Sequence, residues 1–118
     1  MKGVCVSTDS KVEVRDFGKP LYKTVGEAVG GCIEIVHPYG LRRPYVMIVN
    51  EEGLLLDLDI NPIGCDLYRT MRHGQPIVGN IVIMKVGYAD GEPDIVGLAD
   101  NEIEEIKKLI CGGIKNAK

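Results

Sequence analysis

The chain has 118 residues, a length typical of one domain, and its apolar fraction of 45% and charged fraction of 26% are ordinary globular values that argue against disorder. The net charge of −3 disfavours a general nucleic-acid binder, because such proteins usually present a basic stripe. The charge is uneven: seven Lys and Arg face five Asp and Glu in residues 1–50, and seven face twelve in residues 51–118. The first half is therefore a candidate anion-binding region, with an ordinary solvated surface as the alternative.

Four cysteines, Cys5, Cys32, Cys65 and Cys111, lie far apart in the sequence, so the spacing of a zinc site is missing and no metal or cofactor is expected. The first residues hold no apolar run of signal-peptide length, and no stretch of about 18 apolar residues occurs. We therefore expect a single cytoplasmic domain over residues 1–118 that spans no membrane, with the cysteines as buried thiols.

The first third of the chain predicts two strands followed by a helix. Residues 3–7 and 12–17 are strand-like and flank turn residues, and residues 21–29 place apolar side chains at helical spacing. Gly30 and Gly31 then end the helix.

The middle of the chain predicts an antiparallel meander of three strands, at residues 32–36, 45–50 and 54–58. Leu54, Leu56 and Leu58 alternate with Leu55, Asp57 and Asp59, so we expect the first three to face the core and Asp57 and Asp59 to face water. The expected core is aliphatic and contains Leu54, Leu56, Leu58, Val46, Ile48, Ile33, Ile35, Val82 and Met84.

Two more helices are expected. Pro62 suits the first turn of a helix over residues 62–71, with Ile63, Leu67 and Met71 on one face. A strand over residues 81–86 comes next, followed by a long polar connection over 87–98 that we expect to be mobile over residues 88–93. Residues 101–111 then form an amphipathic helix, capped by Asn101 and Glu104 and ended by Gly112 and Gly113, with an apolar stripe of Ile103, Ile106, Leu109 and Ile110. We expect it to pack on its own sheet, with exchange between two chains as the alternative. The fold class is thus α+β.

The sequence gives little support for a catalytic site. Only His37 and His73 could serve as a base for a Ser or Cys nucleophile, and no local motif joins them to one. A weaker possibility is an anion at the helix start around Asn61. We expect a protein that is not an enzyme.

The loops carry the best candidates for binding. Tyr39, Arg42 and Arg43 lie in a loop bounded by prolines, and Arg69, Arg72 and His73 gather near the end of the second helix. Arginine recognises phosphate and carboxylate groups through paired hydrogen bonds, and tyrosine offers a stacking face. The same residue types make nucleotide sites and protein-binding hot spots.

Four short motifs, V-G-G-C-I-E at 29–34, N-E-E-G at 50–53, Asn61, and I-V-G-N-I-V at 77–82, resemble the core of a domain-of-unknown-function family found in phages, plasmids and their hosts. The resemblance covers residues 12–86 and leaves out the C-terminal helix. It implies a small non-enzymatic domain in a mobile-element setting, in the host cytoplasm where a phage encodes it.

Two functional hypotheses follow. The first is a homo-oligomeric protein that sequesters a small anionic ligand, such as a nucleotide signal of host defence, through the loop arginines and tyrosine. The alternative is a protein-interaction module that inhibits a host or phage protein through the exposed sheet face or an open strand edge.

Overall fold

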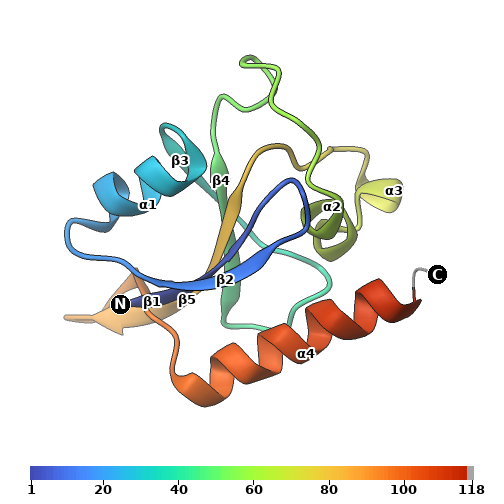
Figure 1. The fold of residues 1–118 in the computed structure, drawn as a ribbon. Helices are drawn as coiled ribbons and strands as arrows, with labels where there is room; N and C mark the ends of the chain where they lie inside the picture. Colours follow the sequence, from blue (N-terminus) through green and yellow to red (C-terminus); the bar gives the residue numbers. More distant parts are fainter. Residues whose placement is uncertain (117–118) are drawn as a thin grey trace.

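The computed structural model describes residues 1–116 of the chain. Its centre is an antiparallel sheet in the order β2-β1-β5-β4-β3, with β6 also paired to β5 (Figure 1). Strand β5 pairs with β1 through its first residues and with β6 through its last ones, so β1 and β6 lie along the same side of β5. The strands are β1 (Lys2–Val6), β2 (Val12–Asp16), β3 (Ile33–Val36), β4 (Tyr45–Asn50), β5 (Ile81–Ala89) and β6 (Glu92–Val96).

Helices cover both faces of this sheet, which makes a three-layered α+β fold and confirms the expected class. Helix α1 (Leu21–Val29) packs on one face over Ile48, Val82 and Met84. Helices α2 (Pro62–Tyr68) and α4 (Asp100–Asn116) pack on the other face over residues such as Met47 and Ile83, and the short α3 (Thr70–His73) follows α2 (Figure 1).

The alternation of side chains along β4 explains why this strand is apolar throughout. Met47 belongs to the core on the α4 side and Ile48 to the core on the α1 side, because successive strand residues point to opposite faces. All six residues of β4 are buried. The predicted core residues Val46, Ile48, Val82 and Met84 are confirmed, whereas Ile33 is only partly buried and Ile35 is exposed.

The third strand of the predicted meander is wrong. Residues 51–57 form hydrogen-bonded turns, in which the Leu56 N–H donates to the Glu52 carbonyl at 2.9 Å and the Leu58 N–H to the Gly53 carbonyl at 3.1 Å. Asp57 adopts a left-handed backbone with φ 55°, which a strand does not allow. Leu54 and Leu56 are therefore exposed and Leu58 is half-buried, and β4 pairs with β5 in place of residues 54–58.

Two more boundaries differ from the sequence-based prediction. Helix α2 ends at Tyr68, because Arg69 is left-handed with φ 62°, and Met71 is consequently 98% exposed. Residues 88–93, expected to be mobile, instead end β5 and begin β6 around a turn in which Asp90 and Gly91 have positive φ, so most of the expected connection over 87–98 is strand.

The C-terminal helix packs on the sheet of its own chain, as expected. Ile103, Ile106 and Ile110 are buried in the core on that face, whereas Leu109 is exposed. The helix begins at Asp100, where Glu102 accepts the Ala99 N–H at 2.8 Å, so Glu102 takes the capping role predicted for Glu104. Gly112 and Gly113 do not end the helix, which continues to Asn116.

Candidate functional site

Three aromatic rings meet where the loop after β3 reaches the end of α2. The Tyr39 ring stacks on the His73 imidazole with centroids 3.8 Å apart and planes 14° apart. The Tyr68 ring lies edge-on to both, at 5.5 Å from Tyr39 and 6.1 Å from His73. Tyr39 is 58% exposed, so a face of this ring stack is open to solvent. We call Tyr39, Tyr68, Arg69, Arg72 and His73 the aromatic–arginine cluster.

Backbone contacts bring these segments together. The Gly40 N–H donates to the Leu67 carbonyl at 2.8 Å, which fixes the loop to the end of α2. A Cβ at Gly40 would lie only 3.1 Å from that carbonyl oxygen, so the close approach depends on glycine. The left-handed Arg69 then turns the chain into α3, and this turn returns His73 to Tyr39.

The cluster carries more positive than negative charge. Arg69 lies 3.8 Å from the Asp66 carboxylate and donates to the Asp66 carbonyl at 3.3 Å, a weak and exposed pair. Within the described range, Arg43 and Arg72 form no ion pair with a carboxylate, and both are exposed. An anion can therefore approach this region without displacing a strong ion pair.

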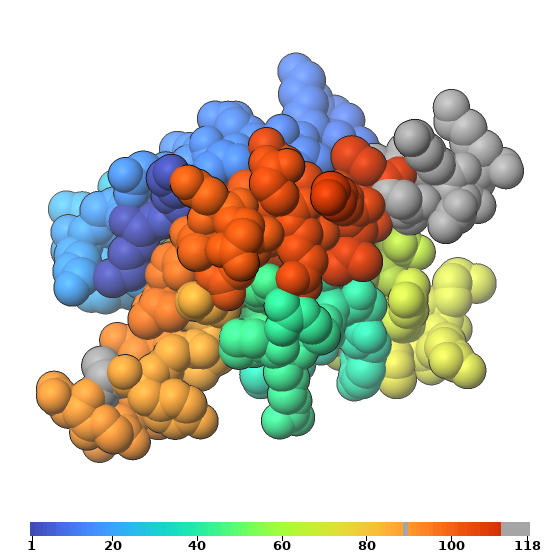
Figure 2. Space-filling model, turned by 90° about the horizontal axis from the view of Figure 1, so that it is seen from below, coloured from blue at the N-terminus to red at the C-terminus, as the bar shows by residue number. Residues whose placement is uncertain are grey.

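Arg42 is directed towards helix α4 and not towards the aromatic–arginine cluster. Its Nε and Nη2 both donate to the Glu105 carboxylate at 2.8 Å, and its guanidinium lies 5.1 Å from the Tyr45 ring centroid. The Arg42 hydrogen bond holds the pKa of Glu105 below its usual value, and the same bond raises the pKa of Arg42. Arg42 thus ties the loop over residues 37–44 to helix α4, and Figure 2 shows this loop (green) alongside the helix (orange to red).

The structure thus joins three of the six sequence-predicted site residues, Tyr39, Arg69 and His73, with Arg72 following in α3. Arg42 is turned to α4, and Arg43 lies beside Arg42, exposed to solvent. Tyr68 was missed, because the apolar pattern assigns it to the side of a longer helix. No sequence signal marked Arg69 as the residue at which the helix ends.

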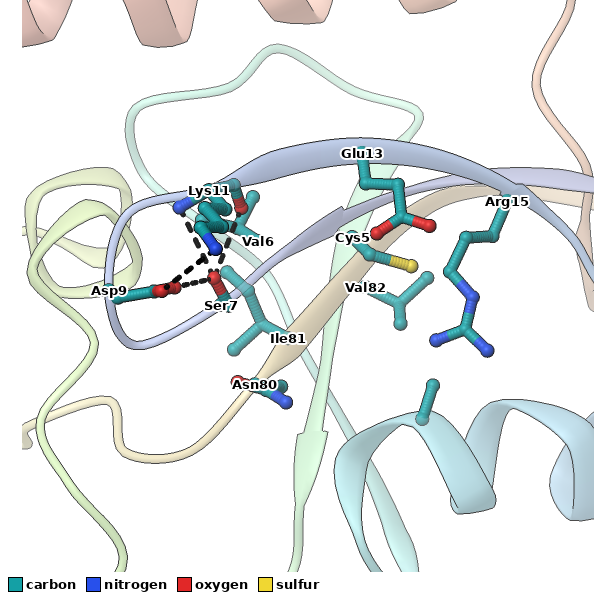
Figure 3. Close-up of a pocket in the computed structure, with 11 residues that line it drawn as sticks. Cys5, Val6, Ser7, Asp9, Lys11, Glu13, Arg15, Asn80, Ile81 and Val82 are labelled. Carbon is teal, nitrogen blue, oxygen red and sulfur yellow. Dashed lines mark hydrogen bonds and ion pairs between the residues drawn. The ribbon is translucent and has the colours of Figure 1, made fainter.

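A second, polar pocket of about 270 Å³ lies between the β1–β2 hairpin and α1. In Figure 3 the Cys5, Glu13 and Arg15 side chains extend from the two strands into the same space. Burial raises the pKa of the Cys5 thiol to about 11, against the opposing effect of Arg15. Lys11 and Arg15 are balanced by Asp9 and Glu13 in the lining, so this pocket has no excess of positive charge for an anion.

The two buried asparagines have structural roles. Asn61 is fully buried, donates through Nδ2 to the Val6 and Gly79 carbonyls at 3.0 and 2.9 Å, and accepts the Gly64 N–H at 2.9 Å. Asn50 donates to the Val29 carbonyl and accepts the Glu52 N–H. The Asn61 side chain therefore caps the helix start, and its bond to the Gly64 N–H takes a donor that an anion there would need.

The four cysteines differ in their exposure. Cys32 and Cys111 are exposed and Cys5 and Cys65 half-buried, so the expectation that all four thiols are buried is wrong. Within residues 1–116 no three His, Cys, Asp or Glu side chains gather in a way that suits a metal ion. Over the same range no helix combines the length and apolar character needed to cross a bilayer.

Comparisons with known proteins bear on the fold and the family. No curated protein matches the chain. A solved structure titled "Crystal structure of small RNA methyltransferase HEN1" is similar, with a TM-score of 0.59 at 16% identity. The match covers 96% of this chain but only 16% of that one, and at this identity it shows the fold alone. A family model matches residues 1–111, which extends the resemblance from residues 12–86 towards both ends and takes in most of α4. The chain belongs to this family, described as a domain of unknown function (DUF3846).

Proposed function

We propose that this protein is a non-enzymatic binding protein that captures a small anionic ligand containing a flat ring, such as a nucleotide, at the aromatic–arginine cluster. The observation that carries the proposal is the stack of Tyr39 on His73 at 3.8 Å, with arginines on the adjacent turn. A ligand ring adds to the open face of the stack, because aromatic side chains bind the π-face of any base.

Charge supports the same ligand class. Arg69 and Arg72 lie on the turn and the short helix that carry His73, and Arg43 lies in the loop that carries Tyr39. Guanidinium groups bind phosphate oxygens through two parallel N–H donors, so one ligand engages the rings through its base and the arginines through its phosphate. Arg42 is left out of this proposed site, because its Nε and Nη2 already donate to the Glu105 carboxylate.

The proposed site is open to solvent, and this is relevant to the oligomeric state of the protein. Met71 lies in α3 next to Arg72 and is 98% exposed. We propose that a second copy of the chain covers Met71 and closes the site, since small domains rarely enclose a ligand alone. Light scattering with and without ligand tests this part separately.

The biological role is proposed from the family resemblance and not from the geometry. In the phage or plasmid setting that the resemblance implies, the captured ligand is a nucleotide signal of host defence. The protein then acts by sequestering this signal, which needs affinity and abundance but no catalytic group.

Isothermal titration against cyclic mononucleotides, cyclic dinucleotides and ADP-ribose derivatives tests the proposal. We expect one class to bind, and Tyr39→Ala to weaken it by about 5- to 150-fold, because base stacking is worth about 1–3 kcal/mol. Arg69→Ala is expected to weaken the phosphate-bearing ligands more than the matching nucleosides.

Tyr22→Ala is the matched control, because Tyr22 is an exposed tyrosine on α1, 72% accessible and outside the cluster. The control should bind as the parent protein does. The proposal would be ruled out if the folded protein bound no member of the panel. It would also be ruled out if Tyr22→Ala and Tyr39→Ala lost affinity equally.

A further inference from the structure

A second surface, independent of the aromatic–arginine cluster, lies in the segment between β4 and α2, residues 51–60, which we call the leucine loop. It projects from the body of the molecule at the top of Figure 1. Leu54, Leu55 and Leu56 are 59%, 84% and 55% exposed, and Ile60 is 60% exposed. Four large apolar side chains within seven residues leave an apolar surface in water, the usual mark of an interaction site.

The leucines are held outward by an ordered backbone. The Leu56 and Leu58 N–H groups donate to carbonyls of residues 52 and 53, and the Gly79 N–H donates to the Asp59 carbonyl at 2.7 Å. Gly53 is buried, and a Cβ there would lie 2.7 Å from a Val78 methyl group, so the base of the loop is packed against the body. Because the loop backbone is already ordered, binding through its leucines costs little further conformational entropy.

The charge around the leucines decides what kind of surface they fit. Glu51, Glu52, Asp57 and Asp59 flank them, all four exposed, and no Lys, Arg or His occurs from Tyr45 to Tyr68. Four carboxylates repel both anionic lipid headgroups and nucleic-acid phosphates. A membrane and a nucleic acid are thus disfavoured, and a surface that is apolar at its centre and cationic at its rim is favoured.

We propose that the leucine loop docks into an apolar groove of a partner protein whose rim carries Lys or Arg side chains. The leucines fill the groove, and the flanking carboxylates pair with the rim. This assigns a surface to the protein-interaction role that the sequence left open as an alternative, and it does not rest on the proposed anion site.

A second copy of this chain fits the loop less well. The chain has an apolar groove of about 870 Å³ beside α1, with Ile33, Ile35 and Ile95 in its lining. Its charged lining residues are Lys19 and Asp94, one of each sign, and the amine of Met1 is already paired with Asp16 at 2.7 Å. This groove offers no cationic rim to four carboxylates.

Site-specific photocrosslinking tests the proposal. The photoreactive amino acid p-benzoylphenylalanine replaces Leu55 in one protein and Tyr22 in the control, since both positions are highly exposed. Each protein is irradiated in extract from cells that naturally carry the gene, and the attached peptide is mapped by mass spectrometry. We expect one protein product at position 55 that is missing at position 22, attached through an apolar segment with Lys or Arg beside it.

The mapped partner is then purified and titrated. Leu55→Ser should weaken binding at least tenfold, while the variant Glu51→Gln, Glu52→Gln, Asp57→Asn, Asp59→Asn should slow association and flatten its salt dependence. Asparagine keeps the left-handed backbone of Asp57 accessible. A crosslinked homodimer, lipid or nucleic acid, an acidic partner segment, or no product specific to position 55 with both proteins folded would each overturn the proposal.

Discussion

Replacing Asn61 with alanine tests how much the hydrogen bonds of this side chain stabilise the fold. The Asn61 side chain is fully buried and joins β1, the turn before β5 and helix α2 through its bonds to Val6, Gly79 and Gly64. Alanine removes all three bonds at once. The cavity that alanine leaves is lined by the two carbonyls and the one N–H, each of which loses its Asn61 partner.

The magnitude follows from these contacts. Loss of a helix cap costs about 1 kcal/mol, and leaving two buried carbonyls without a donor adds about 1–2 kcal/mol for each, which makes about 3–5 kcal/mol in all. Domains of this size are stable by about 5–15 kcal/mol, so Asn61→Ala should bring the protein close to unfolding. Asn61→Asp should cost at least as much at neutral pH, because a carboxylate oxygen then faces the Val6 and Gly79 carbonyls.

Urea denaturation followed by circular dichroism measures the effect as a lower midpoint with an unchanged slope. Asn80→Ala is the matched control, because Asn80 is exposed and, within the described part of the chain, its side chain accepts only the Thr8 N–H, at 3.2 Å. The control should change the free energy of unfolding by less than about 0.5 kcal/mol. An Asn61→Ala protein that loses less than about 1 kcal/mol would refute the reasoning, since that is the cost of the cap alone.

Three further predictions concern α4 and the cysteines. Glu102 accepts from Lys85 Nζ at 2.8 Å, which holds its pKa below the usual value. Its contribution to stability is thus complete above the unfolded pKa of about 4.3 and is lost as pH falls through the lower folded pKa, so Glu102→Gln should flatten the acid limb of a pH–stability curve. Cys5, whose pKa burial raises to about 11, should react with iodoacetamide at pH 8 far more slowly than the exposed Cys32. Truncation after Leu98 should unfold the chain in circular dichroism, because it exposes the core surface that α4 covers.

Each of these has a contradicting outcome. An acid limb that is the same in Glu102→Gln and the parent would show that the Lys85 contact adds nothing. Equal labelling rates at Cys5 and Cys32 would show that the β1–β2 pocket opens freely. A shortened protein that keeps its sheet would make α4 an accessory.

Much of the fold could be predicted because apolar spacing reports which side chains are buried. Helix α1 and strand β4 match residues 21–29 and 45–50, since each has a simple period and clear ends. The alternation of Leu54, Leu56 and Leu58 is the same kind of signal, but the strand that it predicts over residues 54–58 does not form. Sequence periodicity assumes that apolar residues face the core, and here a left-handed Asp57 and the buried Gly53 hold them in water.

The candidate site could be predicted only in part, because side-chain partners come from tertiary contacts. Tyr39 and His73 lie 34 positions apart and meet through the Gly40 contact with α2, which no local pattern announces. In the sequence Arg42 is as good a candidate for a binding residue as Arg69, but its partner Glu105 lies on the last helix, 63 positions away. Residue type suggested what each group can bind, and packing decided which groups are available.

Mapping of ligand-induced chemical shifts shows which residues of the protein bind the nucleotide. A ¹H–¹⁵N spectrum of the labelled protein is recorded during titration with the tightest nucleotide of the panel. We expect the largest shifts on residues 39–40 and 68–73, with the amides around Arg15 and Leu55 unchanged. Saturable shifts centred on the β1–β2 pocket, or no shift at millimolar nucleotide, would contradict it.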